Sequence, residues 1–366
     1  MLLLCVVSFI VALLSAGLII RWGRDHAVTY GQAMPQRFHF GEVPRLGGAA
    51  LLLGIMAGWS VGALQSQWGD PASLRLGAWM SGWLLVLVPA ALGGLAEDVT
   101  QRLLVRYRLA LTGASGILAV WLLDLTVPRT GFEWLDALIA MAPWVGLGVV
   151  VMAVSGLPHA FNIIDGYNGL AGMVALIVSL ALAHVALQVG DRSLAALLVT
   201  TAAATGGFLV WNYPRGMLFA GDGGAYVWGI VIALASISLV QRNADVSPWF
   251  PMLLLIYPVW ETVFSIYRKA VRGISPSVAD ALHFHQLIYR RIVREVFHDD
   301  ESRRMLMRNN RTSPYLWGFT LLTVVPAVLF WSNTPVLMAF CGLFVVTYVV
   351  AYMAIVRFKV PNWLRH

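Results

Sequence analysis

Long apolar blocks alternate with short polar segments along this chain. A helix needs about 20 apolar residues to cross a bilayer, and a block of that length indicates a membrane span. The pattern predicts an all-α, polytopic membrane protein with about eleven transmembrane helices, in a single membrane domain over 1–366. The expected spans lie near 1–20, 46–66, 76–96, 108–127, 137–157, 169–189, 193–211, 223–240, 249–267, 315–332 and 335–356.

The basic residues predict how these spans are threaded. With the N-terminus outside, 21 of the 25 Lys and Arg residues fall on cytoplasmic connections or on the C-terminal tail. Because short cytoplasmic loops carry an excess of Lys and Arg, this split predicts an outside N-terminus and a cytoplasmic C-terminus. The sizeable polar connection over 268–314 is cytoplasmic in the same threading.

Composition supports the membrane class. The chain is 59% hydrophobic and 12% charged, with a mean hydropathy of +0.75, whereas a soluble domain carries about twice that charged fraction. The net charge of +7 is explained by orientation in the membrane, so no nucleic-acid partner is expected. Cys5 and Cys341 lie inside apolar blocks, and their placement predicts neither a disulfide framework nor a zinc knuckle.

Five acidic residues from distant parts of the chain fall at the predicted cytoplasmic face: Glu97, Asp98, Asp165, Asp222 and Glu261. A single acid at a helix end is usually a cap or a solvated loop residue. Carboxylates that converge at one face suit a hard cation such as Mg²⁺, which takes a few protein oxygens together with substrate phosphates.

Arginines accompany the acids. Arg45 precedes the second span in PRLGG, and Arg102, Arg106 and Arg108 follow the Glu97–Asp98 pair. Topological anchoring is the alternative for each arginine taken singly. Sites of phosphoryl transfer, however, combine acidic residues that bind a metal with arginines that bind phosphate.

The segment FNIIDGYNGL, at 161–170, interrupts two apolar blocks. Asn162 and Asp165 are three residues apart and can share one helix face. Gly166 and Gly169 would let a ligand approach the backbone. A capping turn is the alternative, but a turn rarely needs this many amide and carboxylate groups.

The 268–314 connection carries two further predictions. Ser275–Pro276 indicates a helix start, and from Leu287 onward apolar residues alternate with arginines, as in a basic helix that lies on an anionic membrane surface. His283 and His285 would face different directions on a regular helix. They are therefore expected to donate to a phosphate or sugar, and a zinc site is only weakly supported.

Five motifs occur in order along the chain: PRLGG, the Glu97–Asp98 pair, FNIIDGYNGL, GDGGAYVWG at 221–229 and HFHQ at 283–286. With the predicted topology, they resemble the polyprenyl-phosphate N-acetylhexosamine-1-phosphate transferase family, integral-membrane enzymes that begin bacterial cell-envelope glycan assembly. NIIDGYNGL and HFHQ look like the glycan-initiating branch, which includes the undecaprenyl-phosphate N-acetylglucosaminyl-1-phosphate transferases and begins O-antigen, enterobacterial common antigen or teichoic-acid linker synthesis.

The resemblance implies roles for particular residues. Asp222 would bind Mg²⁺ with the help of Asn162, and Mn²⁺ is the alternative ion. Asp98 would deprotonate or orient the lipid phosphate, and Glu97 would assist it. The residues expected to bind the substrates are Asp165, Asn168, His283, His285, Arg45, Arg102 and Arg108.

The implied reaction moves a sugar-1-phosphate from a UDP-N-acetyl amino sugar to undecaprenyl phosphate and releases UMP. It would take place at the cytoplasmic face of the bacterial inner membrane, among membrane lipids. Small-residue pairs such as Ala50 and Gly54 would permit close helix packing, including that of a homodimer. A secondary transporter or lipid flippase is the alternative, but transporters tend to place ionisable residues near the bilayer midplane, and a scaffold without activity leaves the five acids unexplained.

Overall fold

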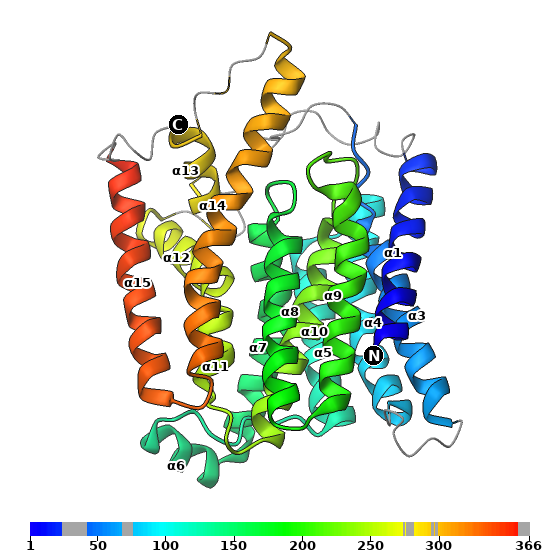
Figure 1. The fold of residues 1–366 in the computed structure, drawn as a ribbon. Helices are drawn as coiled ribbons and strands as arrows, with labels where there is room; N and C mark the ends of the chain where they lie inside the picture. Colours follow the sequence, from blue (N-terminus) through cyan, green and yellow to red (C-terminus); the bar gives the residue numbers. More distant parts are fainter. Residues whose placement is uncertain are drawn as a thin grey trace.

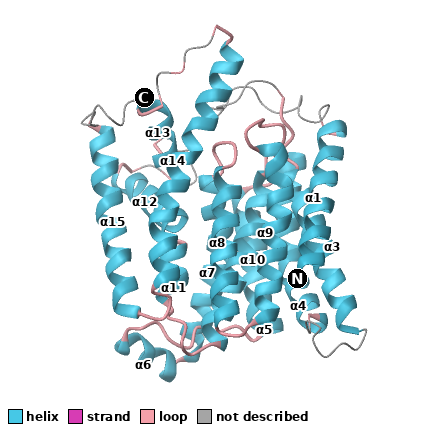
Figure 2. Cartoon of the chain, viewed as in Figure 1, coloured by secondary structure: helices cyan, strands magenta, loops and turns pink. Residues whose placement is uncertain are grey.

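The computed structural model describes residues 1–23, 42–67, 76–273, 275, 282–293, 296 and 299–357, and this part of the chain contains helices and no strand (Figure 2). The helices are α1 (Leu2–Trp22), α3 (Gly47–Gln67), α4 (Gly77–Thr100), α5 (Val105–Leu123), α6 (Glu133–Met141), α7 (Pro143–Ile164), α8 (Leu170–Gln188), α9 (Arg192–Asn212), α10 (Gly221–Arg242), α11 (Trp249–Leu254), α12 (Ile256–Val271), α13 (Phe284–Arg291), α14 (Glu301–Leu329) and α15 (Thr334–Val356). The all-helical fold class is confirmed.

Nine helices within the described ranges are long and apolar enough to cross a membrane. The protein is therefore a polytopic membrane protein, as predicted. The two other expected spans coincide with α5 and with the α11–α12 pair. The latter segment breaks at Leu255, because Pro258 has no N–H to donate to the carbonyl of Leu254 and its ring crowds that carbonyl. The span count of eleven and the outside N-terminus stay predictions.

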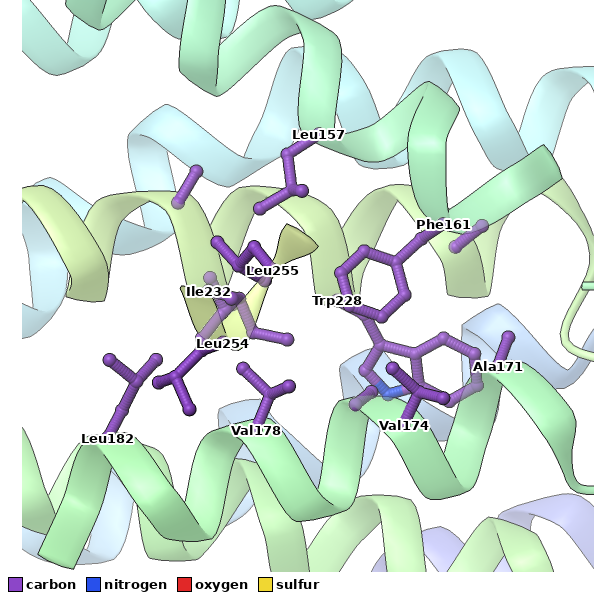
Figure 3. Packing of buried hydrophobic residues seen from close by; sticks show 14 of the residues in the cluster. Leu157, Phe161, Ala171, Val174, Val178, Leu182, Trp228, Ile232, Leu254 and Leu255 are labelled. Carbon is purple, nitrogen blue, oxygen red and sulfur yellow. The ribbon is translucent and has the colours of Figure 1, made fainter. Parts of the chain in front are cut away.

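The helices run side by side, and α1 begins at the end of the bundle opposite to the one where α15 ends (Figure 1). Helix α10 lies in the middle of the bundle. Within its apolar 18-residue stretch, 94% of the residues are buried, and the helix packs against α3, α4, α7 and α8. Figure 3 shows Trp228 and Ile232 of α10 between Leu157 and Phe161 of α7 and the valines of α8.

Glycines let the backbones of the central helices approach closely. A Cβ added at Gly94 of α4 would lie 2.6 Å from the Cα of Gly223 on α10, and one added at Gly48 of α3 would meet the Gly223–Gly224 backbone. Such close approach is the main source of helix association inside lipid, where apolar burial between helices gains little. Helices α3 and α4 therefore hold the first turn of α10 through backbone contact.

The predicted basic helix differs from the observed one. Helix α13 spans only eight residues, and Leu287, Ile288, Ile292 and Val296 are all buried inside the protein. Its apolar side packs on protein instead of lipid, because α14 and α15 cover it. Arg294 and Pro276, which belong to the predicted helix and to the predicted helix start, lie outside the described residues.

Helix α14 begins at Glu301, well before the expected span start at 315. Asp300 caps it by accepting a hydrogen bond from the backbone N–H of Ser302 (2.8 Å). This 29-residue helix reaches beyond the upper end of the bundle (Figure 1), and its polar first half contacts the loop between α7 and α8.

Candidate active site

Asp222 is the point where three helices meet. It lies in the first turn of α10, where its carboxylate forms a close ion pair with Arg108 of α5 and accepts a hydrogen bond from the Asn162 side chain of α7 (2.7 Å). Its side chain is 17% exposed. The structure thus brings together two residues predicted as metal ligands, Asp222 and Asn162, with one of the predicted phosphate-binding arginines.

Asp98 fixes the start of α10. This residue is buried at the end of α4, and its two carboxylate oxygens accept the backbone N–H groups of Asp222 and Gly223, each at 2.8 Å. A carboxylate at a helix N-terminus satisfies backbone donors that have no partner within the helix and complements the helix dipole. Asp98 therefore sets where Asp222 stands, and its predicted contact with the lipid phosphate stays a prediction.

The PRLGG segment runs beside the approach to α10. Phe219 donates its backbone N–H to the carbonyl of Pro44, and Gly47 and Gly48 donate theirs to the carbonyls of Phe219 and Ala220, all at 2.9 Å. A Cβ at Gly221, where φ is +69°, would collide with the carbonyl oxygen of Arg45. This pairing places Arg45 next to the Asp98–Asp222 cluster.

Glu97 and Arg102 lie at the turn between α4 and α5. One Glu97 oxygen accepts the backbone N–H of Leu103 (2.8 Å), and Gln101 at the end of α4 adopts φ +52°. The Arg102 side chain is exposed. Glu97 thus holds the turn that leads to Arg108, and the predicted catalytic assistance of Glu97 and phosphate contact of Arg102 stay predictions.

Asp165 follows the end of α7, one turn after Asn162. The pKa of Asp165 is raised to about 7, mainly by burial and also by the negative charge of Asp222, while the positive charge of Arg45 opposes both influences. Asp165 therefore lies close enough to Asp222 and Arg45 for their charges to influence it, and its predicted role in the nucleotide-sugar pocket stays a prediction.

Asn168 is buried and connects the loop between α7 and α8 to α14. Its backbone N–H donates to the Asn309 side chain (2.8 Å), its side-chain amide donates to Asn310 (3.0 Å), and its carbonyl accepts from the Ser313 hydroxyl (2.6 Å). Gly169, at φ +72°, donates to Asn212 (2.6 Å). The contacts of Asn168 are those of a loop anchor, and its predicted role in the sugar pocket stays a prediction.

The two histidines lie side by side, contrary to the expectation from helical spacing. Their rings are nearly parallel, 9° apart, with centroids 5.4 Å from each other. The helical argument fails because His283 is the N-cap of α13, with extended backbone at ψ 149°, so only His285 is inside the helix.

His285 also reaches the FNIIDGYNGL segment. A Cβ on Gly166 would lie 2.8 Å from His285 Nε2, and the His285 ring packs edge-on against Tyr167 (5.5 Å). The glycine beside Asp165 is thus the residue that allows the histidine to approach. The histidine motif and the Asn162–Asp165 segment lie at the same end of the bundle.

A polar chain beside Asp222 was not predicted. Thr112 Oγ1 lies 3.1 Å from His159 Nε2 and also 3.1 Å from the carbonyls of Arg108 and Leu109. The Tyr226 hydroxyl lies 3.4 Å from both His159 Nδ1 and Asp222. Tyr226 comes one helical turn after Asp222, a spacing that could have indicated it. His159 comes three residues before Asn162, a spacing that could likewise have indicated it.

Among the described residues, no three His, Cys, Asp or Glu side chains form a group that could hold a metal by themselves. The donors near Asp222 are oxygens and amides, without sulfur. This set suits a hard cation such as Mg²⁺, which often uses one or two carboxylates and completes its shell with water and substrate phosphates. It does not suit a structural zinc site.

Comparison with known proteins finds relatives of this chain. The model of "Glycosyl transferase family 4" matches residues 80–240, which run from α4 through α10 and include Asp98, Asn162 and Asp222. The chain is 26% identical, over 76% of its length and 76% of the relative, to a Bacillus subtilis protein named "Probable undecaprenyl-phosphate N-acetylglucosaminyl 1-phosphate transferase". The chain is thus similar to enzymes of the polyprenyl-phosphate N-acetylhexosamine-1-phosphate transferase family.

Two further relatives carry the same description, "Undecaprenyl-phosphate alpha-N-acetylglucosaminyl 1-phosphate transferase". The one from Thermotoga maritima is 31% identical over 37% of this chain and 41% of its own length. The one from Escherichia coli strain K12 is 25% identical over 69% of this chain and 66% of its own length. These similarities support the resemblance seen in the five motifs.

Proposed function

We propose that the protein transfers a sugar-1-phosphate from a UDP-N-acetyl amino sugar to undecaprenyl phosphate, at the cytoplasmic face of a bacterial inner membrane. The products are the lipid-linked sugar pyrophosphate and UMP, and the reaction begins the assembly of O-antigen or another cell-envelope glycan. Similarity to the relatives named above supports the reaction class. The Lys and Arg residues of the predicted cytoplasmic connections support the choice of face.

One observation carries the proposal: Asp222, Asn162 and Arg108 meet at the end of the bundle where α10 starts. A carboxylate and an amide offer oxygens to a cation, and a guanidinium offers N–H groups to a phosphate. A nucleotide-sugar pyrophosphate needs both. Asp165, beside Gly166 and His285, extends this surface toward the histidine segment.

Asp222 and Asn162 would hold Mg²⁺, and the oxygen donor set described above fits this ion. When bound, Mg²⁺ neutralises charge on the pyrophosphate. Asp98 keeps Asp222 in place by accepting the two backbone N–H groups at the start of α10. Arg108 and Arg45 compensate the negative charge of the phosphates, and Arg102 at the neighbouring turn adds to the same positive region.

In the reaction, an oxygen of the lipid phosphate attacks the phosphorus that carries the sugar. A new P–O bond forms, the bond to the bridging oxygen of the pyrophosphate breaks, and UMP leaves with that electron pair. The residues of the site position the two reactants and stabilise the developing charge, which are the main sources of rate in phosphoryl transfer. In this proposal Asp98, with Glu97, orients the attacking phosphate, and His283 and His285 contact the pyrophosphate or the amino sugar.

Purified protein in lipid nanodiscs, given undecaprenyl phosphate, Mg²⁺ and UDP-N-acetyl sugars, tests the proposal. We expect UMP release with at least one donor and none without the lipid phosphate. A folded protein that releases no UMP from any donor contradicts it. Movement of substrate across liposomes without chemical turnover would instead favour the transporter alternative. A screen of UDP-N-acetylglucosamine, UDP-N-acetylgalactosamine and their 6-deoxy relatives identifies the donor.

A further inference from the structure

A buried carboxylate outside the Asp222 cluster organises the histidine segment. Glu261 lies on α12 and is 0% exposed. It accepts hydrogen bonds from His283 Nδ1 (3.0 Å), from the backbone N–H of Phe284 (3.2 and 3.3 Å) and from the Tyr348 hydroxyl (2.7 Å). A buried carboxylate is costly unless donors surround it, and here the donors come from the histidine segment and from α15.

The contact decides which ring nitrogen of His283 carries hydrogen. A carboxylate oxygen can only accept, so Nδ1 of His283 donates to Glu261 at 3.0 Å. The His283 side chain also stands where it can accept the backbone N–H of Gln286 in the capping box of α13. The bond to the buried carboxylate is the stronger of the two because its acceptor is charged, so it decides the hydrogen position. The carboxylate also fixes the plane of the ring. Since the His285 ring lies parallel to it, the two rings are oriented together.

Helix α15 holds the same segment from its other side. The Tyr352 hydroxyl donates to the carbonyl of Leu282 (3.3 Å), and Arg291 donates to the carbonyls of Ile355 and Val356 (3.1 and 2.9 Å). Tyr348 itself packs against Phe284, with ring centroids 4.9 Å apart. These contacts lie outside residues 80–240, so the part of the chain that matches the family model does not include them.

We propose that Glu261 and Tyr348 are positioning residues, which keep His283 in the Nδ1–H form and hold its ring in the orientation that meets the substrate. Substrate contact rests on the proposed function, whereas the hydrogen position on His283 does not depend on it. Removing the hydrogen-bond partner that fixes the hydrogen on a functional histidine commonly lowers activity by about 10- to 100-fold.

Nitrogen-15 NMR of histidine-labelled protein in nanodiscs tests the hydrogen position directly. A His283→Asn variant assigns the His283 signals by difference. We expect an Nδ1–H signature in the wild type and its loss in Glu261→Ala. We expect Glu261→Gln to retain it, because the amide oxygen still accepts from His283 and Phe284 while the NH₂ group donates to the Tyr348 oxygen.

Activity should follow the same order. We expect kcat to fall about 10- to 100-fold in Glu261→Ala and by a smaller factor in Glu261→Gln and Tyr348→Phe. Asp191→Asn is the matched control: it alters a buried acid that caps α9 and pairs with Arg242 (3.2 Å), and we expect wild-type spectra and kcat. Thermal unfolding of every variant identifies those that fail to fold.

Two results would overturn the proposal. One is an Nδ1–H signal of His283 that persists unchanged in folded Glu261→Ala. The other is wild-type kcat and KM in that variant. An inactive wild type contradicts the proposed function instead, and the spectra then still decide whether Glu261 sets the hydrogen position on His283.

Discussion

The Asp222 cluster and the histidine segment lie at the same end of the bundle but are held by different contacts. Asp222 is positioned through backbone: Asp98 accepts two backbone N–H groups, and glycines on α3 and α4 meet the start of α10. His283 is positioned through side chains, by Glu261 and Tyr348. A close contact between two backbones is lost when a substitution adds a Cβ between them. A set of side-chain hydrogen bonds can instead be weakened one bond at a time. The two clusters should therefore respond differently to substitution.

The largest effect is expected at Asp222 itself. Asp222→Asn retains the size of the side chain but removes the charge that pairs with Arg108 and would attract a cation. We expect UMP release to fall about 10³-fold, a loss comparable to that of one strong electrostatic contact in other active sites. Asp191→Asn, which changes a buried acid at the opposite end of the bundle, should retain the wild-type rate. Near-wild-type activity of Asp222→Asn would remove this residue from the centre of the site.

Backbone positioning is tested by a pair of glycine substitutions. Gly94→Ala places a Cβ 2.6 Å from the Cα of Gly223, so α4 and α10 must separate. We expect a loss of about 1–3 kcal/mol in the free energy of unfolding and an activity loss of more than about 10-fold. Gly113→Ala on α5 meets nothing within 4 Å and should be neutral or slightly stabilising, since Ala favours a helix over Gly.

Both variants are measured by thermal unfolding and UMP release in the same nanodiscs. If Gly94→Ala and Gly113→Ala lower stability and rate equally, then close packing of α4 on α10 is not what positions Asp222.

The sequence predicted the fold class and the grouping of the site well, because both depend on strong local signals. Apolar blocks of membrane length identify spans, and arginine placement brings Asp98, Asn162 and Asp222 to one face. These three residues do meet in the structure. The helix boundaries were harder. A capped polar helix start at Asp300 extends α14 far beyond its apolar part, and Pro258 divides an apolar block into two helices.

The partners of the histidines and of Asn168 could not be predicted for a different reason. Glu261 and Tyr348 are 87 residues apart, and Asn168 and Ser313 are 145 apart. No local spacing connects such pairs, since they meet only when α12, α14 and α15 pack. His283 also misled the helical argument, because an N-cap has extended backbone although its neighbours are helical.

Asn168 tests whether a loop anchor also contacts substrate. Asn168→Ala removes the donor to Asn310, and Ser313→Ala removes the donor to the Asn168 carbonyl, while each leaves the other bond in place. We expect Ser313→Ala to lose about 1–2 kcal/mol of stability, because the buried carbonyl of Asn168 is left unpaired. Asn168→Ala should lose about 1 kcal/mol, because Asn310 is only partly buried and can bond to water instead. KM for the UDP-sugar should stay within about threefold of the wild type, which unfolding and initial-rate measurements check. A large KM increase in Asn168→Ala alone would instead support the predicted contact with the sugar nucleotide.

The most specific effect is expected at Asp165. Burial raises its pKa to about 7 from the model-peptide value of 3.8, so between these pH values the folded protein holds a proton that the unfolded chain has released. The stability of the wild type should therefore fall as pH rises through this window. Asp165→Asn has no such proton, so its stability relative to the wild type should rise over the same window, by no more than about 4 kcal/mol. Unfolding temperatures measured across the window, with Asp245→Asn in an exposed loop as control, check this trend.

Activity then separates the two interpretations of Asp165, as a residue that only ends α7 and as part of the nucleotide-sugar pocket. The backbone N–H of Asp165 donates to the Asn162 carbonyl (3.3 Å) in either variant, so a residue that only ends α7 should retain activity as Asn. A carboxylate that forms part of the nucleotide-sugar pocket should not, and a loss of about 10-fold or more at pH 8, where the wild type is ionised, would show that its charge is used.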